Sequence, residues 1–155
     1  MSTPEKKTLV EAIGHLVMRF QDATQQFDEE VGELYGLNAA ERHCLSFLYR
    51  GPQTPGAIAR EIRLTPAAVT ALVDRLERRG FVTRTADPND RRKVLVAFTE
   101  QTARMTAEVY TPTGEAGARM LAEFSEKELA TFAKILKRSI AIQEEMTVKL
   151  LSRKR

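Results

Sequence analysis

The stretch Leu64–Phe98, LTPAAVTALVDRLERRGFVTRTADPNDRRKVLVAF, decides the fold. Thr65 is a favourable N-cap residue, and Pro66 loses no hydrogen bond at the first helical position. Four apolar residues follow at the i, i+3, i+4, i+7 spacing of one helix face: Val69, Leu72, Val73 and Leu76. Gly80 comes next, where glycine readily adopts the left-handed conformation that ends a helix. The first half of the stretch therefore predicts a capped amphipathic helix.

The second half of the stretch predicts a β-hairpin. Two β-rich runs, residues 81–85 and 92–98, flank the turn sequence Ala-Asp-Pro-Asn-Asp at residues 86–90. Proline fixes φ, and Asp and Asn bond to nearby backbone, so this sequence favours a tight turn. Three cations gather at the tip, Arg91, Arg92 and Lys93. A capped helix followed by a basic hairpin predicts a winged helix-turn-helix.

The segment before residue 64 supplies the other short helices of this motif. Gly36 ends the N-terminal pattern, and Asn38 can cap a helix after it. Thr54-Pro55 repeats the pairing of cap and proline and opens a short helix a few residues before Thr65. Two short helices joined by a brief turn are the helix-turn-helix pair.

Long helices are predicted on both sides of this motif. After Thr3-Pro4, apolar residues keep a helical stripe to about residue 34, whereas the mean helix has about 11–12 residues. Thr99 can cap a helix after the hairpin, with a kink or break expected at the proline and glycine of residues 110–114. Ser125 and Glu128 form a capping box for the last helix, which carries two apolar stripes.

These patterns predict a mainly α fold with a small β-wing, in a single domain covering residues 1–155. The winged helix-turn-helix occupies residues 35–100, and residues 1–34 and 101–155 form dimerisation helices. A long first helix packed only within its own chain is the alternative to a homodimer. The predicted dimer-interface residues are Leu9, Ile13, Leu16, Leu136, Ile140, Met146 and Leu150.

Charge is distributed unevenly along the chain. The net charge is only +3, but residues 51–104 hold 10 basic and 6 acidic residues, giving +4. Residues 1–50 hold 5 basic and 8 acidic residues, giving −3, and residues 105–155 hold 9 and 7, giving +2. The positive excess centres on the predicted winged helix, as expected for a nucleic-acid footprint. We find no membrane-spanning run and no signal peptide, so we expect a cytoplasmic protein.

Other chemistries have weak support. Glu11 and His15 lie four residues apart on one predicted helix, but no denser ligand cluster accompanies them, so we predict a surface pair and no metal site. The single cysteine, Cys44, lies on an apolar stripe and is predicted to be a small core residue. With no phosphate loop or nucleophile elbow, we expect neither a cofactor nor an enzyme activity.

The decisive stretch resembles the MarR family of bacterial transcription regulators. The resemblance rests on the helix from Thr65, Arg79-Gly80-Phe81-Val82, Arg84 and the run Asp87-Pro88-Asn89-Asp90-Arg91-Arg92. Asp90 and Arg92 match the Asp-x-Arg signature of the family wing. One departure follows, because the family usually has Leu-Thr-x-x-Gly after the wing and this chain has Phe-Thr-Glu-Gln-Thr at residues 98–102.

The resemblance implies a repressor that a small hydrophobic or aromatic ligand releases from DNA. Loose candidates for walls of the ligand site are Phe20, Tyr35 and Phe47. A two-fold dimer would read a pseudo-palindromic double-stranded operator, with a helix start in the major groove and a wing arginine in the minor groove. A winged-helix scaffold that binds protein is the alternative function. The predicted DNA-contacting residues are Thr65, Pro66, Ala67, Ala68, Thr70, Ala71, Arg75, Arg84, Asp90, Arg91, Arg92 and Lys93.

Overall fold

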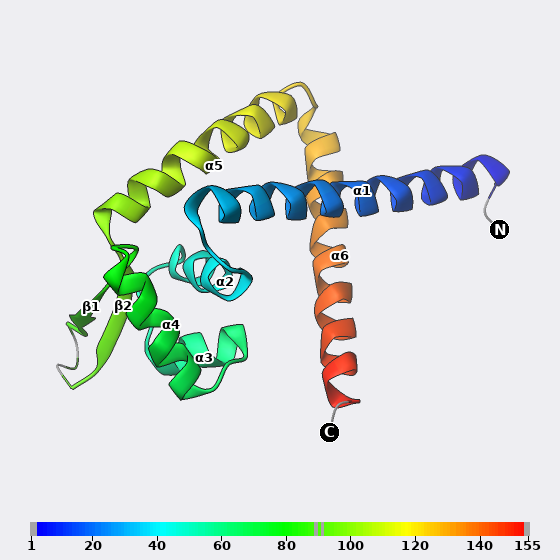
Figure 1. Ribbon diagram of the computed structural model, residues 1–155. Helices are drawn as coiled ribbons and strands as arrows, with labels where there is room; N and C mark the ends of the chain where they lie inside the picture. Colours follow the sequence, from blue (N-terminus) through cyan, green and yellow to red (C-terminus); the bar gives the residue numbers. More distant parts are fainter. Residues whose placement is uncertain (1–2, 89, 91, 154–155) are drawn as a thin grey trace. The chain divides into compact units, whose positions relative to one another are not determined.

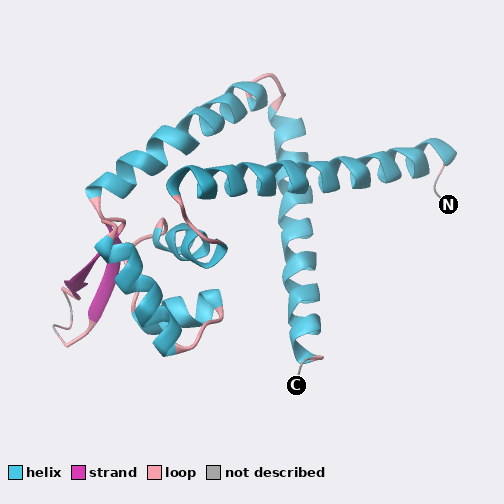
Figure 2. Ribbon diagram, in the orientation of Figure 1, coloured by secondary structure: helices cyan, strands magenta, loops and turns pink. Residues whose placement is uncertain are grey.

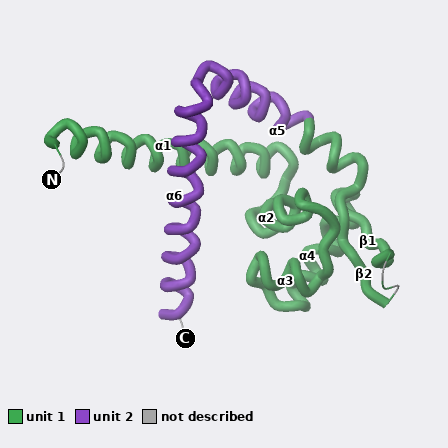
Figure 3. Tube along the Cα trace, turned by 180° about the vertical axis from the view of Figure 1, so that it is seen from behind, with its two compact units in different colours: residues 1–107 green, residues 108–155 purple. Residues whose placement is uncertain are grey.

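The computed structural model describes residues 3–88, 90 and 92–153. The chain divides into two compact units, residues 1–107 and residues 108–155 (Figure 3). The predicted mainly α fold with a small β-wing is confirmed, and no helix in the described part is long and apolar enough to cross a membrane. In chain order (Figures 1 and 2), the elements are α1 (Pro4–Tyr35), α2 (Ala39–Leu48), α3 (Pro55–Ile62), α4 (Pro66–Arg78), β1 (Val82–Ala86), β2 (Val94–Phe98), α5 (Glu100–Leu121) and α6 (Glu126–Ser152).

Side-chain caps fix where most of the helices begin. In each case the cap oxygen accepts a hydrogen bond from the backbone N–H three residues further on, which satisfies a donor that the helix leaves unpaired. The predicted capping box of α6 is confirmed, and α2 has a second one that the sequence analysis missed. The predicted caps that the structure confirms in this way are Thr3, Asn38, Thr54, Thr65 and Ser125.

Three helices of unit 1 end in a residue with left-handed backbone. Gly36 follows α1 with φ 60°, and Gly80 follows α4 with φ 75°, which confirms the left-handed conformation predicted for Gly80. Beyond Gly80, the N–H of Phe81 donates to the carbonyl of Leu76 at 2.9 Å, so the chain turns sharply after α4. The third helix, α3, ends in the same way, but its left-handed residue is Arg63, with φ 55°.

The hydrophobic core of unit 1 lies among α2, α3, α4 and the wing. Ile58 of α3 and Val96 of β2 are fully buried within it. The predicted apolar face of α4 points into this core, which leaves the opposite face of the helix toward solvent. Each of its four members is at most 1% exposed: Val69, Leu72, Val73 and Leu76.

The wing is an antiparallel hairpin with one further bridge. β1 pairs with β2 in the register Val82↔Phe98 to Ala86↔Val94, and Gln53 exchanges two backbone hydrogen bonds with Val96, at 2.9 and 2.8 Å. β2 begins at Val94, two residues later than predicted. The turn extends through Lys93, whose N–H donates to the carbonyl of Asp90 at 2.8 Å.

The start of α5 is tied to the end of α4 by two threonines. Thr99 caps α5 by accepting from the N–H of Thr102 at 3.2 Å, and its hydroxyl donates to the carbonyl of Gly80 at 2.7 Å. Thr102, which stands where the family usually has glycine, is 1% exposed, and its hydroxyl donates to the carbonyl of Phe81 at 2.7 Å. The departure from the family pattern therefore adds a buried hydrogen bond at this junction.

The predicted interruption of α5 near residues 110–114 is wrong. α5 runs from Glu100 to Leu121 with Pro112 inside it. A proline removes one backbone hydrogen bond, here the one to the carbonyl of Glu108. Glu108 is exposed, so water can satisfy that carbonyl, and the helical segments on both sides continue through the site.

Candidate nucleic-acid interface

The first turns of α4 present a face of small side chains. Thr65, Pro66, Ala67, Thr70 and Ala71 are exposed. Small side chains allow a helix start to approach another surface closely, and the unpaired N–H groups there favour a phosphate. Ala68, also predicted to contact DNA, is half-buried.

The wing tip holds an arginine away from the body of the protein. Asp90 Oδ1 accepts from the backbone N–H of Arg92 at 3.1 Å and lies 3.4 Å from Arg92 Nε, while Asp90 Oδ2 lies 3.8 Å from Lys93 Nζ. The predicted contact between Asp90 and Arg92 is therefore confirmed. The Arg92 side chain is 92% exposed, so Asp90 orients it without burying it. Arg91, predicted to contact DNA, lies outside the described residues, as does Asn89.

These two parts belong to the same edge of unit 1. In Figure 1 the start of α4 and the start of β2 both lie toward the lower edge of the view. The small face of α4 and the start of β2 therefore lie toward the same side of unit 1 in this view.

The Arg75 side chain, predicted to contact DNA, is hydrogen-bonded within the chain. Its Nε donates to Glu41 Oε1 at 3.2 Å, and Glu41, at the start of α2, is only 4% exposed. Glu41 Oε2 also accepts from the backbone N–H of Asn38 at 3.0 Å, which fixes the carboxylate. Arg75 therefore ties α4 to the start of α2, and base reading by its terminal nitrogens stays a prediction.

Arg84 joins the wing to α4. Its guanidinium donates to Asp74 Oδ1 at 2.5 Å and also bonds Glu77, and its backbone N–H donates to Glu77 Oε1 at 3.1 Å. Desolvation lowers the pKa of Arg84, but the hydrogen bonds and charges of Asp74 and Glu77 outweigh it, so the pKa is raised. This pairing gives Arg84 a structural role, whereas its predicted contact with DNA stays a prediction.

Arg79, one of the residues that carry the family resemblance, has a structural role that the sequence analysis did not predict. Its guanidinium donates to the carbonyls of Gly36 at 2.8 Å and Tyr35 at 2.6 Å, and it stacks 4.9 Å from the centre of the Phe81 ring. It therefore connects the end of α4 to the end of α1. The sequence gives no sign of these hydrogen bonds, because the partners of Arg79 lie more than 40 residues away.

The three candidate ligand residues do not gather at one place. Tyr35 and Phe47 pack, partly buried, against the core, whereas Phe20 is 73% exposed. Phe20 and Tyr35 are 15 residues apart on the continuous helix α1, or about 22 Å at the usual helical rise. Within one chain they therefore cannot line the same small pocket.

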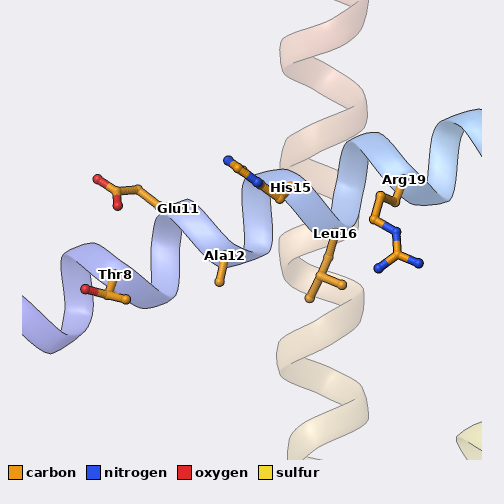
Figure 4. Close-up of a pocket in the computed structure, with 6 residues that line it drawn as sticks. All are labelled: Thr8, Glu11, Ala12, His15, Leu16 and Arg19. Carbon is orange, nitrogen blue, oxygen red and sulfur yellow. The ribbon is translucent and has the colours of Figure 1, made fainter.

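A hollow on α1 has only one wall. Figure 4 shows its six lining residues, and all of them come from this helix: Thr8, Glu11, Ala12, His15, Leu16 and Arg19. An open stretch of one helix cannot enclose a ligand. Glu11 and His15 belong to it as surface residues, and the described residues hold no cluster of three or more His, Cys, Asp or Glu that could bind a metal ion.

Cys44 is a core residue, as predicted. Its side chain is fully buried. Burial, and secondly the charge of Glu41, raise the pKa of the thiol to about 11. A thiol that is protonated at neutral pH and shielded from solvent is a poor nucleophile.

The predicted dimer-interface residues lie exposed on two helices. On α1 they are Leu9, Ile13 and Leu16, which are 62, 47 and 60% exposed. α6, in unit 2, contains no buried residue over its 27 residues. Its predicted interface residues are 43–61% exposed: Leu136, Ile140, Met146 and Leu150.

The short helices α2 and α3, the helix α4 and the hairpin together define a winged helix-turn-helix protein. The sequence model of the MarR family matches residues 35–93. The HTH-type transcriptional regulator YsmB of Bacillus subtilis is 30% identical over 79% of this chain and 82% of its own length. YcgE, another HTH-type transcriptional regulator of that species, is 29% identical over 94% of this chain and 96% of its own length.

Solved structures agree with the sequence comparisons. A MarR family protein from Bacillus stearothermophilus superposes with a TM-score of 0.63 and 26% identity, covering 91% of this chain and 97% of that one. The complex of S. aureus MepR with DNA shares the fold, with a TM-score of 0.58 and 20% identity over 84% of this chain and 98% of that one. This chain belongs to the MarR family, whose members are transcriptional regulators and not enzymes.

Proposed function

We propose that the chain binds double-stranded DNA as a homodimer and represses transcription from a pseudo-palindromic operator. The observation that carries the proposal is the small, exposed start of α4 at the same edge as Arg92, which Asp90 orients at the wing tip. A small-faced helix start suits the major groove, where all four base pairs can be distinguished. An extended arginine suits the minor groove and its negative potential. The structure of MepR bound to DNA supports the proposal through its shared fold.

The apolar stripes of α1 and α6 support the homodimer. Large apolar side chains that remain about half exposed along two long helices form surfaces that a monomer rarely leaves in water. A second copy of the chain has the same apolar surface, so it can cover these stripes without a different partner protein. In a two-fold dimer, the two recognition helices would reach major grooves about 34–36 Å apart.

The dimer can be tested with one charge on each face of α1. Ile13→Asp places a carboxylate on the apolar stripe and should dissociate or unfold the protein at micromolar concentration. Gln26→Asp, on the polar face of the same helix, should leave the mass measured by sedimentation equilibrium unchanged. A wild-type protein that sediments as a stable monomer would rule out the dimer.

DNA binding can be tested through its salt dependence. We expect tight binding to the duplex upstream of the chain's own gene, and Arg92→Ala should lower the slope of log K against log salt by about one unit for each half-site. Arg104→Ala, which removes the same charge from an exposed position on α5, should leave the slope unchanged. If the wild type binds and Arg92→Ala has the same slope of log K against log salt as the wild type, the wing does not contact the DNA. No binding to any duplex would favour the protein-binding scaffold.

We further propose that a small aromatic ligand weakens DNA binding. Only a ligand that binds the DNA-free conformation better can shift the equilibrium. Tyr35 and Phe47 remain candidates because both lie at the edge of the core near the end of α1 and on α2. Titration of the DNA complex with benzoate and with phenol, followed by fluorescence anisotropy, tests the proposal. Unchanged DNA affinity with both probes would count against an aromatic effector.

A further inference from the structure

Arg63 occupies a backbone position for which arginine is a poor choice. It is the one non-glycine residue with positive φ in the described part of the chain, at φ 55° and ψ 44°. A side chain in this conformation crowds the following carbonyl, at a cost of roughly 1–2 kcal/mol. The N–H of Leu64, the next residue, donates to the carbonyl of Ala59 at 3.2 Å, which closes the same turn that ends α1 and α4.

The chain uses glycine at the two equivalent positions. Gly36 and Gly80 adopt the left-handed conformation at the ends of α1 and α4. The turn at the end of α3 therefore does not require arginine, and its backbone geometry would favour glycine or asparagine there. Because the backbone conformation at this position disfavours arginine, the presence of arginine there suggests a function for its side chain.

The Arg63 side chain has no such role within the chain itself. It is exposed, and it has no hydrogen bond or ion pair with the residues that the structure describes. Its acidic neighbour Glu61 lies 3.9 Å from His43 Nε2, on the side of α2. The guanidinium of Arg63 is therefore available to a partner that binds from outside.

The position of Arg63 indicates what that partner is. Arg63 lies two residues before Thr65, the cap of α4, and so beside the helix start that we propose for the major groove. Because Arg63 comes just before the turn that we propose for the major groove, we expect it at the border of that groove, where the phosphates lie. Arginines at such borders fix the register of a protein on DNA without reading its sequence.

We infer that Arg63 contacts a DNA phosphate beside the major groove that receives α4. The inference rests on the proposed DNA-binding function. It predicts opposite effects on the fold and on DNA binding, because the same residue strains the backbone and supplies a charge. Arg63→Gly and Arg63→Asn both remove the charge and both tolerate the left-handed conformation.

The experiment measures melting temperature and DNA affinity for the full-length chain. Both variants should melt at or above the temperature of the wild type, at equal protein concentration. Both should bind DNA roughly fivefold more weakly at 0.15 M salt, with a slope of log K against log salt lower by about one unit per site. The loss should be equal for the upstream duplex and for an unrelated duplex, because a phosphate contact carries no sequence information.

Two controls separate the charge from the backbone. Arg63→Lys retains a cation and should bind DNA within about twofold of the wild type. Arg19→Asn removes an exposed arginine from α1 and should leave the salt slope unchanged. A lower melting temperature in both Arg63→Gly and Arg63→Asn, or wild-type DNA affinity and slope in them, would overturn the inference. Failure of the wild type to bind any duplex would instead overturn the proposed function.

Discussion

Replacing Arg79 with alanine should lower the free energy of unfolding by about 2.5–3 kcal/mol. The guanidinium donates to the carbonyls of Gly36 and Tyr35 at 2.8 and 2.6 Å, and these carbonyls end α1. Hydrogen bonds from a charged donor contribute about 1.5–3 kcal/mol each. Because the Arg79 side chain is 40% exposed, we take about 1 kcal/mol for each bond. The stacking on Phe81, at 4.9 Å, adds about 0.5–1 kcal/mol.

Urea unfolding followed by circular dichroism measures this loss, at one fixed protein concentration because a dimer is expected. Arg78→Ala is the matched control. Among the residues that the structure describes, the Arg78 side chain donates only to the carbonyl of Asp74 in its own helix, at 3.3 Å, so its removal should change stability by less than about 0.5 kcal/mol. Equal losses in the two variants, or no loss in Arg79→Ala, would refute the assignment of Arg79 as the link between α4 and α1.

Two further outcomes follow from the buried polar groups of unit 1. Thr102→Gly, which restores the residue usual in the family, should destabilise the protein by about 0.5–1.5 kcal/mol in the same assay, because the carbonyl of Phe81 loses the hydroxyl donor at 2.7 Å and keeps only the N–H of Thr99 at 3.2 Å. Equal stability would show that water replaces the hydroxyl. Cys44 should react with a disulfide reagent at pH 8 only after unfolding, because its pKa is raised to about 11. Since the unfolded thiol loses its proton near pH 9 and the folded one near pH 11, its contribution to stability should fall as pH rises through this interval, and Cys44→Ala should flatten that fall.

Local signals account for the parts of the fold that the sequence predicts well. A Thr-Pro pair marks a helix start wherever it occurs, because both the side-chain cap and the fixed φ act within one turn of the chain. Gly80 and the turn after β1 are equally local. The predicted break at residues 110–114 was wrong because the cost of Pro112 depends on whether the carbonyl that loses its hydrogen bond meets water, and exposure is a tertiary property.

The partners of the basic residues could not be predicted in the same way. Arg75 meets Glu41 across 34 residues of sequence, and Arg79 meets carbonyls more than 40 residues away. The spacing of residues along the chain does not predict these hydrogen bonds, because they depend on how α4 is placed beside α1 and α2 in the folded protein. The sequence therefore predicts a basic region correctly but cannot separate its structural arginines from its exposed ones.

This separation determines how mutations in the region should behave. Arg75 and Arg84 each contact carboxylates of their own unit, so a phosphate at either site would also meet the negative charge of the partner. Arg63 has no such partner in the described part of the chain, and Arg92 keeps an exposed guanidinium beside a single carboxylate. The slope of log K against log salt concentration depends only on the cations that neutralise DNA phosphates. Arg84→Ala should therefore lower stability and leave the slope almost unchanged, whereas Arg92→Ala should do the reverse. If both variants lower the slope of log K against log salt equally, then an arginine that is paired within the chain can still contact DNA.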